Sequence, residues 1–264
     1  YVGGISIQPA FPALLMLVVS QAGLLAHNAP APPGLQEYAA SLALTGAAAF
    51  LVFSQPNLST ATLYIASWGA MIFASQIPVG YLAGTGVVGI ATLPVIWANM
   101  DTYMRNRIFN FLDPSLDPGA YYNVQQALIS IGSGGLMGKG FATGTQSQLH
   151  FLRVRHTDFI FSVICEELGF VGAGLILIIF TLLLWRLLRI AANAGDTTGR
   201  LIVSGVTAYI FYQLIINLGM NLNLIPVAGL PMPFISSGGS VLVVTFIGLG
   251  LVESVAMRQR RLEF

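Results

Sequence analysis

Long apolar tracts without a charged side chain alternate with short polar connections along this chain. No Asp, Glu, Lys or Arg occurs between Tyr38 and Met100, and none occurs between Leu201 and Val252. A run of about 20 apolar residues spans a bilayer as a helix, so each tract is long enough for several spans. The pattern predicts seven transmembrane helices, at 10–27, 40–55, 58–76, 79–99, 158–186, 200–222 and 240–257.

Polar residues gather in one long segment, 101–157, between the fourth and fifth predicted spans. A loop of this length without structure of its own is uncommon unless it has a function. We therefore expect short amphipathic or re-entrant helices within it. One of them is predicted at 121–131, ended by the glycines that begin at Gly132.

Composition supports a membrane protein. Charged residues make up 8% of the 264 residues and the mean hydropathy is +0.78, whereas a soluble domain carries about 25% charged residues. A soluble fold would have to hide nearly all of these residues from water. Weak alternation and abundant Leu, Ile and Ala argue against a transmembrane β-barrel. The predicted fold is an all-α, polytopic transmembrane helix bundle that forms a single membrane domain over residues 1–264, with 101–157 as a loop within it.

The charge balance and the cysteine count are less informative. A formal net charge of +1 does not indicate a nucleic-acid partner, and none is expected. The single cysteine, Cys165, excludes an internal disulfide and is expected to be a buried small side chain.

Basic residues predict the orientation. Arg186, Arg189 and Arg200 flank one short loop, and Arg258, Arg260 and Arg261 follow the last predicted span. Positive short loops and tails remain in the cytoplasm, and two spans separate these sites, so both lie on one side. The C-terminus is then cytoplasmic and the 101–157 loop extracytoplasmic.

Two segments have the chemistry to bind an anion. Arg105 and Arg107 can clamp a phosphate, although arginines at a membrane interface also commonly extend toward water or pair with carboxylates such as Asp113. Lys139 lies in a glycine-rich run that is not a P-loop, because Gly140 follows it in place of Ser or Thr. The glycines suit either an anion cradle or a closely packed re-entrant loop.

Carboxylates lie in and next to the fifth predicted span. Asp158 stands at its mouth, and Glu166 and Glu167 lie about two turns deeper. Acidic groups in or near a bilayer are candidates for function. The residues alone also allow Asp158 to be a helix cap and the glutamates to pair with Lys, Arg or the backbone.

These segments, taken in order, resemble the RodA/FtsW family of polytopic peptidoglycan glycosyltransferases. The matching motifs are Ile131–Gly135 with Gly138–Gly140 and Gly144–Gln146, His156–Phe161 with Glu166–Phe170, and Gly229–Ser236 with Gly238–Ser240. Two stretches, Gln146–Leu149 and Asn217–Met220, are more similar to RodA than to FtsW. The likeness is strong from Arg105 to Met257. The family has ten spans, so we expect the seven here to be its last seven.

Some positions depart from the family pattern. Phe11 and Leu14 stand where the family has a buried Glu–Lys pair, Asn57 stands where Asp is usual, and Ser237 where Tyr is usual. Loss of both members of a buried pair can be nearly neutral, because no lone charge remains.

The resemblance implies a function and a location. Lipid II would be joined to a growing glycan strand outside the bacterial inner membrane during cell-wall elongation, releasing undecaprenyl pyrophosphate. Asp158 would be the general base that takes a proton from the attacking sugar hydroxyl. Residues expected to bind the substrate are Arg105, Arg107, Lys139, Gln146, Arg153, Arg155, His156, Thr157 and Ser236.

Further expectations concern cofactors, partners and competing functions. A divalent cation such as Mg²⁺ or Mn²⁺ would assist the departing pyrophosphate. The expected partners are membrane lipid and a class B penicillin-binding protein. Two alternatives stay open: a flippase or transporter of lipid-linked precursors, and a degenerate homologue with a structural role beside the penicillin-binding protein.

Overall fold

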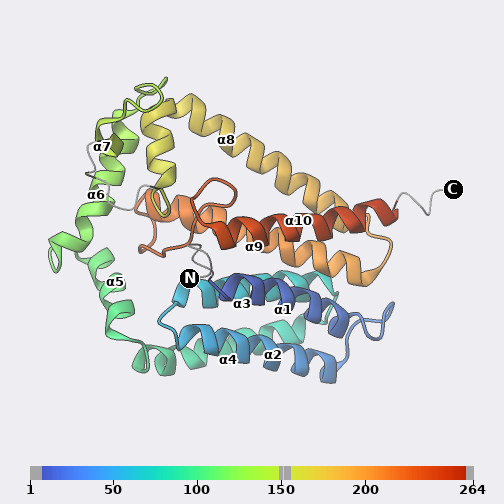
Figure 1. Ribbon diagram of the computed structural model, residues 1–264. Helices are drawn as coiled ribbons and strands as arrows, with labels where there is room; N and C mark the ends of the chain where they lie inside the picture. The colour runs from blue at the N-terminus through green and yellow to red at the C-terminus, as the bar shows by residue number, and fades with distance from the viewer. Residues whose placement is uncertain (1–7, 149–150, 152–155, 260–264) are drawn as a thin grey trace. The chain divides into compact units, whose positions relative to one another are not determined.

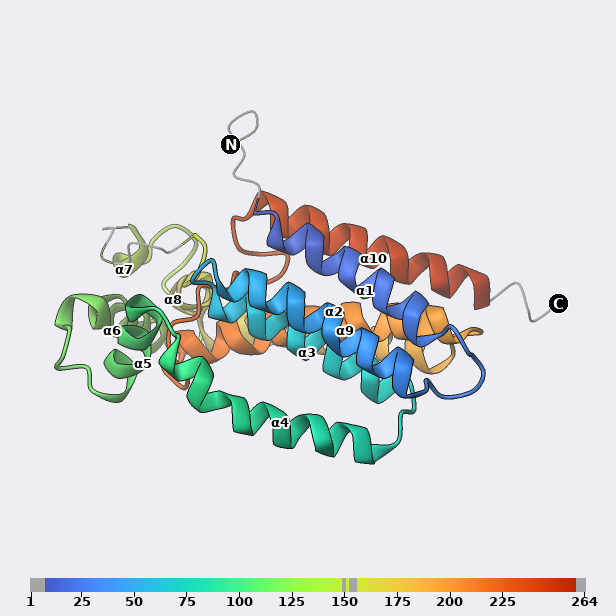
Figure 2. The same ribbon diagram turned by 90° about the horizontal axis from the view of Figure 1, so that it is seen from below.

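The computed structural model describes residues 8–148, 151 and 156–259, and these residues form helices and loops without a β-strand. The helices, labelled as in Figures 1 and 2, are α1 (Ala10–Leu25), α2 (Leu35–Phe53), α3 (Leu58–Ala74), α4 (Val79–Ala98), α5 (Thr102–Leu112), α6 (Pro118–Ser133), α7 (Thr145–Gln148), α8 (Ile160–Ala192), α9 (Thr197–Asn221) and α10 (Gly239–Gln259).

Five of the described helices, α2, α4, α8, α9 and α10, are long and apolar enough to cross a membrane. Helices α1 and α3 are shorter apolar helices of 16 and 17 residues. Together they overlap the seven predicted spans, although α2 begins at Leu35, before the predicted 40, and α8 ends at Ala192, beyond the predicted 186. The prediction of an all-α, polytopic membrane fold is confirmed.

The polar segment 101–157 contains helices α5, α6 and α7. The helix predicted at 121–131 corresponds to α6, which extends beyond the predicted range at both ends. Helix α6 begins at Pro118, whose missing N–H is no loss in a first turn. The Asp117 side chain caps this turn, because its Oδ1 accepts a hydrogen bond from the Gly119 N–H at 3.0 Å.

The described chain divides into two compact units. The site unit contains Asn106–Arg186 and Ile210–Thr245, and the bundle unit contains Gln8–Arg105, Leu187–Tyr209 and the residues from Phe246 onward. The expectation of a single membrane domain over 1–264 stays a prediction.

In the bundle unit, α1, α2 and α3 pack against one another around a buried polar network. The Gln21 side chain donates to the Ser41 carbonyl at 2.9 Å and to Thr45 Oγ1 at 2.8 Å. Ser41 Oγ donates to Gln21 Oε1, and Trp68 Nε1 donates to Ser41 Oγ. Buried polar groups in apolar surroundings are costly unless they are hydrogen-bonded, so this network fixes how the three helices are rotated against each other.

In the site unit, α8 is broken at Gly169, where φ is 67° and ψ is −169°. The two segments on either side of the break meet at an angle (Figure 1). Such a break frees main-chain N–H and C=O groups that an unbroken helix would pair. Lipid offers these groups no partner, so protein groups must supply one.

The glycine-rich loop after α6 supplies these partners. Two of its N–H groups donate to carbonyls before the break, and two N–H groups after the break donate to carbonyls of the loop. The pairs are Lys139 N to Glu166 O (2.9 Å), Gly140 N to Glu167 O (3.0 Å), Phe170 N to Gly135 O (2.9 Å) and Val171 N to Leu136 O (3.1 Å). The loop thus replaces part of the hydrogen bonding that α8 loses.

The close approach of the loop main chain to the α8 main chain requires glycine. A Cβ added at Gly134 would overlap the Cys165 carbonyl, and one added at Gly138 would overlap the Glu167 carbonyl. A Cβ at Gly169 would overlap the Gly138 amide, and its positive φ further disfavours other residues. The interpretation of the glycine run as a closely packed loop is therefore confirmed.

We predict that Gly169→Ala destabilises the fold by about 3 kcal/mol or more, because steric overlap adds to the strain of a positive φ. Thermal unfolding of purified protein in detergent measures the loss. Gly174→Ala is the matched control, since this glycine lies in the same helix and its added Cβ meets nothing within 4 Å. Equal unfolding midpoints for the two variants would contradict the prediction.

Candidate functional site

Asp158 lies in the turn that leads into α8, and it is half-buried. Its main-chain carbonyl accepts hydrogen bonds from the side chains of Asn217, at 3.0 Å, and Asn221, at 2.9 Å. Both asparagines are fully buried in α9. The backbone of Asp158 is therefore held by another helix, and its carboxyl group is not needed for this attachment.

The electrostatics around Asp158 act in opposite directions. Burial raises the pKa of its carboxyl group, whereas a hydrogen bond with the Thr157 side chain and the positive charge of Arg107 lower that pKa. Burial is the largest of these effects. A carboxylate whose pKa is raised in this way accepts a proton more readily at neutral pH than an ordinary aspartate does.

Gly229 brings the connection between α9 and α10 against this carboxylate. A Cβ added at Gly229 would lie 3.8 Å from Asp158 Oδ2 and 3.9 Å from Arg107 Nη1. The carboxylate and the guanidinium therefore converge on one turn of the chain. Gly229 has a φ of 67°, so glycine is favoured there for its backbone as well as for its size.

The same connection is hydrogen-bonded to the turn that carries Asp158. Ser236 Oγ donates to the Thr157 carbonyl at 2.6 Å and accepts from the Met232 N–H at 2.8 Å. The Ser237 N–H donates to the His156 carbonyl at 2.8 Å. The turn that carries Asp158 and the connection between α9 and α10 are far apart in sequence but are thus held side by side.

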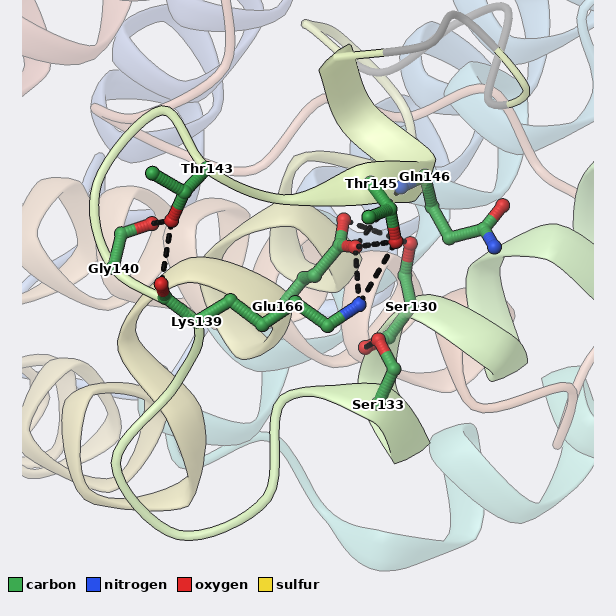
Figure 3. Close-up of polar contacts among 8 residues, drawn as sticks. All are labelled: Ser130, Ser133, Lys139, Gly140, Thr143, Thr145, Gln146 and Glu166. Atoms are coloured by element: carbon green, nitrogen blue, oxygen red, sulfur yellow. Dashed lines mark hydrogen bonds and ion pairs between the residues drawn. The ribbon is translucent and has the colours of Figure 1, made fainter.

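A second polar cluster centres on Glu166, whose side chain is fully buried (Figure 3). Its Oε1 pairs with Lys139 Nζ at 3.0 Å and accepts from Thr145 Oγ1 at 3.2 Å and from the Gln146 N–H at 2.9 Å. Ser130 Oγ lies 3.5 Å from Oε2. The interpretation of Glu166 as the partner of a cation is confirmed, and the cluster ties the loop after α6 to α8.

Three other residues predicted to bind the substrate, Lys139, Gln146 and His156, have different neighbours in the structure. Lys139 contacts Glu166 and Thr145, and the Gln146 side chain points away from Glu166 (Figure 3). His156 is exposed beside Asp158. Arg153 and Arg155 lie outside the described residues.

Arg105 belongs to the bundle unit, whereas Arg107 belongs to the site unit. The Arg105 guanidinium donates to the carbonyls of Trp97 and Ala98 at the end of α4 and lies over the Trp97 ring. A phosphate clamp formed by the two arginines stays a prediction.

Sequence reasoning did not identify Asn221, which donates to the Asp158 carbonyl, or Ser162, whose hydroxyl donates to Asn221 Oδ1, as parts of the site. Asn221 stands four residues after Asn217 in an otherwise apolar stretch, which puts both amides on one face of a helix. Polar side chains repeated at this spacing in a transmembrane helix are the signal that was available.

Comparison with known proteins assigns the chain to a family. The sequence profile of the FtsW/RodA/SpoVE family, described as cell cycle protein, matches residues 1–261. Peptidoglycan glycosyltransferase MrdB of Escherichia coli is 43% identical over 234 residues, which are 88% of this chain and 63% of that protein. The chain therefore spans less than two thirds of the length of this relative.

Solved structures agree. A protein in a structure of a peptidoglycan synthase complex, described as coordinating polymerization and crosslinking, matches 98% of this chain and 72% of its own, with a TM-score of 0.80 and 32% identity. The rod shape determining protein RodA of Thermus thermophilus matches 96% of this chain and 66% of its own, with a TM-score of 0.65 and 31% identity. The chain is a multi-pass membrane protein that belongs to the FtsW/RodA/SpoVE family.

Proposed function

We propose that this chain carries the catalytic part of a peptidoglycan glycosyltransferase that polymerises lipid II during cell-wall elongation. The observation that carries the proposal is the half-buried Asp158 carboxylate, with the Arg107 charge beside it. The relative MrdB is named a peptidoglycan glycosyltransferase, which gives the reaction class. In this reaction a sugar hydroxyl attacks the anomeric carbon of a lipid-linked sugar, and undecaprenyl pyrophosphate departs.

Asp158 is the proposed general base. The attacking hydroxyl must lose a proton as its oxygen bonds to the anomeric carbon, and a carboxylate within hydrogen-bond reach accepts that proton. The leaving pyrophosphate is already a stabilised anion, so the reaction does not require the second carboxylate that glycoside hydrolysis uses. One acidic side chain therefore suffices for this chemistry.

Cations are proposed to stabilise the charge that develops on the departing pyrophosphate. Arg107 has the most suitable position among the described basic residues, since its guanidinium and the Asp158 carboxylate converge on Gly229. The described residues include no group of three or more His, Cys, Asp or Glu side chains that could hold a metal ion. The divalent cation thus stays a prediction without a ready-made protein site in this part of the chain.

The proposed orientation follows from the basic residues. Arg186, Arg189 and Arg200 lie around the connection between α8 and α9, and Arg258 lies in the last turn of α10, so these charges are assigned to the cytoplasmic side. The 101–157 segment and the turn around Asp158 are then extracytoplasmic. The proposed partner is a class B penicillin-binding protein, because a related structure is described as a complex that coordinates polymerization with crosslinking.

We predict that Asp158→Asn lowers lipid II polymerisation by about 10²- to 10⁴-fold, because the general base is removed while the shape of the side chain is kept. Incorporation of labelled lipid II into glycan by the purified full-length protein measures the effect. The base acts when deprotonated, so the wild-type rate should fall as the pH drops through a pKa that burial raises above that of an ordinary aspartate.

Asp113→Asn is the matched control for this experiment, because Asp113 is an exposed carboxylate in the same polar segment. Its activity should equal that of the wild type. Full polymerisation by Asp158→Asn would refute the assignment of the base. Movement of lipid II across vesicles without polymer would instead support the flippase alternative.

Removal of the Lys139 charge is expected to destabilise the fold. Lys139→Met leaves the fully buried Glu166 without its cation, and breaking a buried pair costs about 3–5 kcal/mol. The double variant Lys139→Met/Glu166→Leu should lose less, because no lone charge remains. Thermal unfolding compares the two, with Arg258→Met, which removes an exposed charge, as the control. A single variant as stable as the wild type would show that the pair contributes nothing.

A further inference from the structure

An asparagine side chain takes the place of a main-chain hydrogen bond where α8 begins. In a regular helix the N–H of Ser162 would donate to the carbonyl of Asp158, four residues earlier. Here the Ser162 N–H donates to Asn221 Oδ1 at 3.2 Å, and Asn221 Nδ2 donates to the Asp158 carbonyl at 2.9 Å. The side-chain amide thus stands between a donor and an acceptor that could have paired with each other.

This bridge keeps Asp158 outside the helix. An amide inserted between the two groups holds them too far apart for a helical turn, and α8 accordingly begins at Ile160, after the turn that contains Asp158. Ser162 Oγ also donates to Asn221 Oδ1, at 2.6 Å, which orients the amide. Because Asn221 is fully buried, a change in its orientation would leave polar groups unpaired.

Asn217 attaches the same carbonyl to the connection between α9 and α10. Its Nδ2 group donates to the Asp158 carbonyl at 3.0 Å and to the Leu230 carbonyl at 2.9 Å. Leu230 directly follows Gly229, the residue on which the Asp158 carboxylate and Arg107 converge. One amide group therefore fixes the spacing between the turn of Asp158 and the turn of Gly229.

Both asparagines bind the main chain of Asp158 rather than its carboxylate. Such an attachment orients the residue and leaves the carboxylate oxygens to Thr157, Arg107 and an incoming hydroxyl. Direct hydrogen bonds from the amides to the carboxylate would instead stabilise its charge and weaken it as a base.

We propose that Asn217 and Asn221 are positioning residues that hold Asp158 in the geometry required for proton transfer, an inference that rests on the proposed role of Asp158 as the base. Removal of the Asn221 bridge lets Ser162 pair directly with the Asp158 carbonyl, so that α8 gains part of a turn and the carboxylate moves. A displacement of about 1 Å at a reacting group can lower a rate roughly 100-fold.

The test measures lipid II polymerisation by purified full-length variants, with kcat and KM determined separately. Asn221→Ala should lower kcat roughly 100-fold with little change in KM, because proton transfer and not substrate binding is affected. Asn217→Ala should show a loss of the same kind, which provides a second variant if Asn221→Ala does not fold. The matched control is Gln213→Leu, which removes a fully buried amide on the same helix and should keep the wild-type kcat.

A double-mutant cycle with Asp158→Asn separates positioning from general stability. If Asn221 acts through Asp158, Asn221→Ala should cause no further loss of residual activity in the Asp158→Asn background. An equal loss in both backgrounds would show a merely structural role and would overturn the inference. The inference would also be overturned if Asn217→Ala and Asn221→Ala kept the wild-type kcat while Asp158→Asn was inactive. If Asp158→Asn is itself fully active, the proposed function fails instead.

Discussion

The pairing of main-chain groups at the break in α8 is the constraint on which the site unit depends. A transmembrane helix normally pairs its main-chain N–H and C=O groups within itself, and the break at Gly169 leaves some of these groups without a partner in the helix. The loop after α6 supplies partners for them through main-chain hydrogen bonds on both sides of the break. Because each partner leaves groups unsatisfied without the other, the loop conformation and the helix break are mutually dependent.

The break also explains the position of Glu166. Glu166 lies three residues before the break at Gly169. Its carbonyl accepts from the Lys139 amide and its side chain pairs with the Lys139 ammonium group, so both face the loop. A carboxylate buried in this way is stable only when it is paired and hydrogen-bonded, and the loop provides both. The neutralised pair therefore belongs to the attachment of the loop, whereas the Asp158 carboxylate stays half-buried and near Arg107.

How much the sequence predicts depends on whether a feature is local. Apolar runs set the spans, because the bilayer acts on each helix separately, and α4, predicted at 79–99, is observed at Val79–Ala98. The break at Gly169 was not predicted, because a glycine in an apolar helix has several possible causes and the same helix also contains Gly172 and Gly174. The bridge by Asn221 depends on a residue 59 positions from Ser162, and no local pattern specifies that contact. Asp158 was predicted as a site residue from its charge at a helix mouth and from family resemblance, whereas its backbone anchors were visible only in the structure.

The four positions that depart from the family pattern are accommodated by packing or by hydrogen bonds. Phe11 and Leu14 are almost fully buried, so apolar packing occupies the place where the family has a buried ion pair, and no lone charge remains there. Asn57 still caps α3, because its side-chain oxygen accepts from the Thr60 N–H as an aspartate oxygen would. Ser237 joins the site through its main-chain N–H, a bond that any residue except proline could make. The hydrogen bonds described above for Asp158 and Glu166 use no side chain from these four positions, and on this physical ground the departures are compatible with the proposed activity.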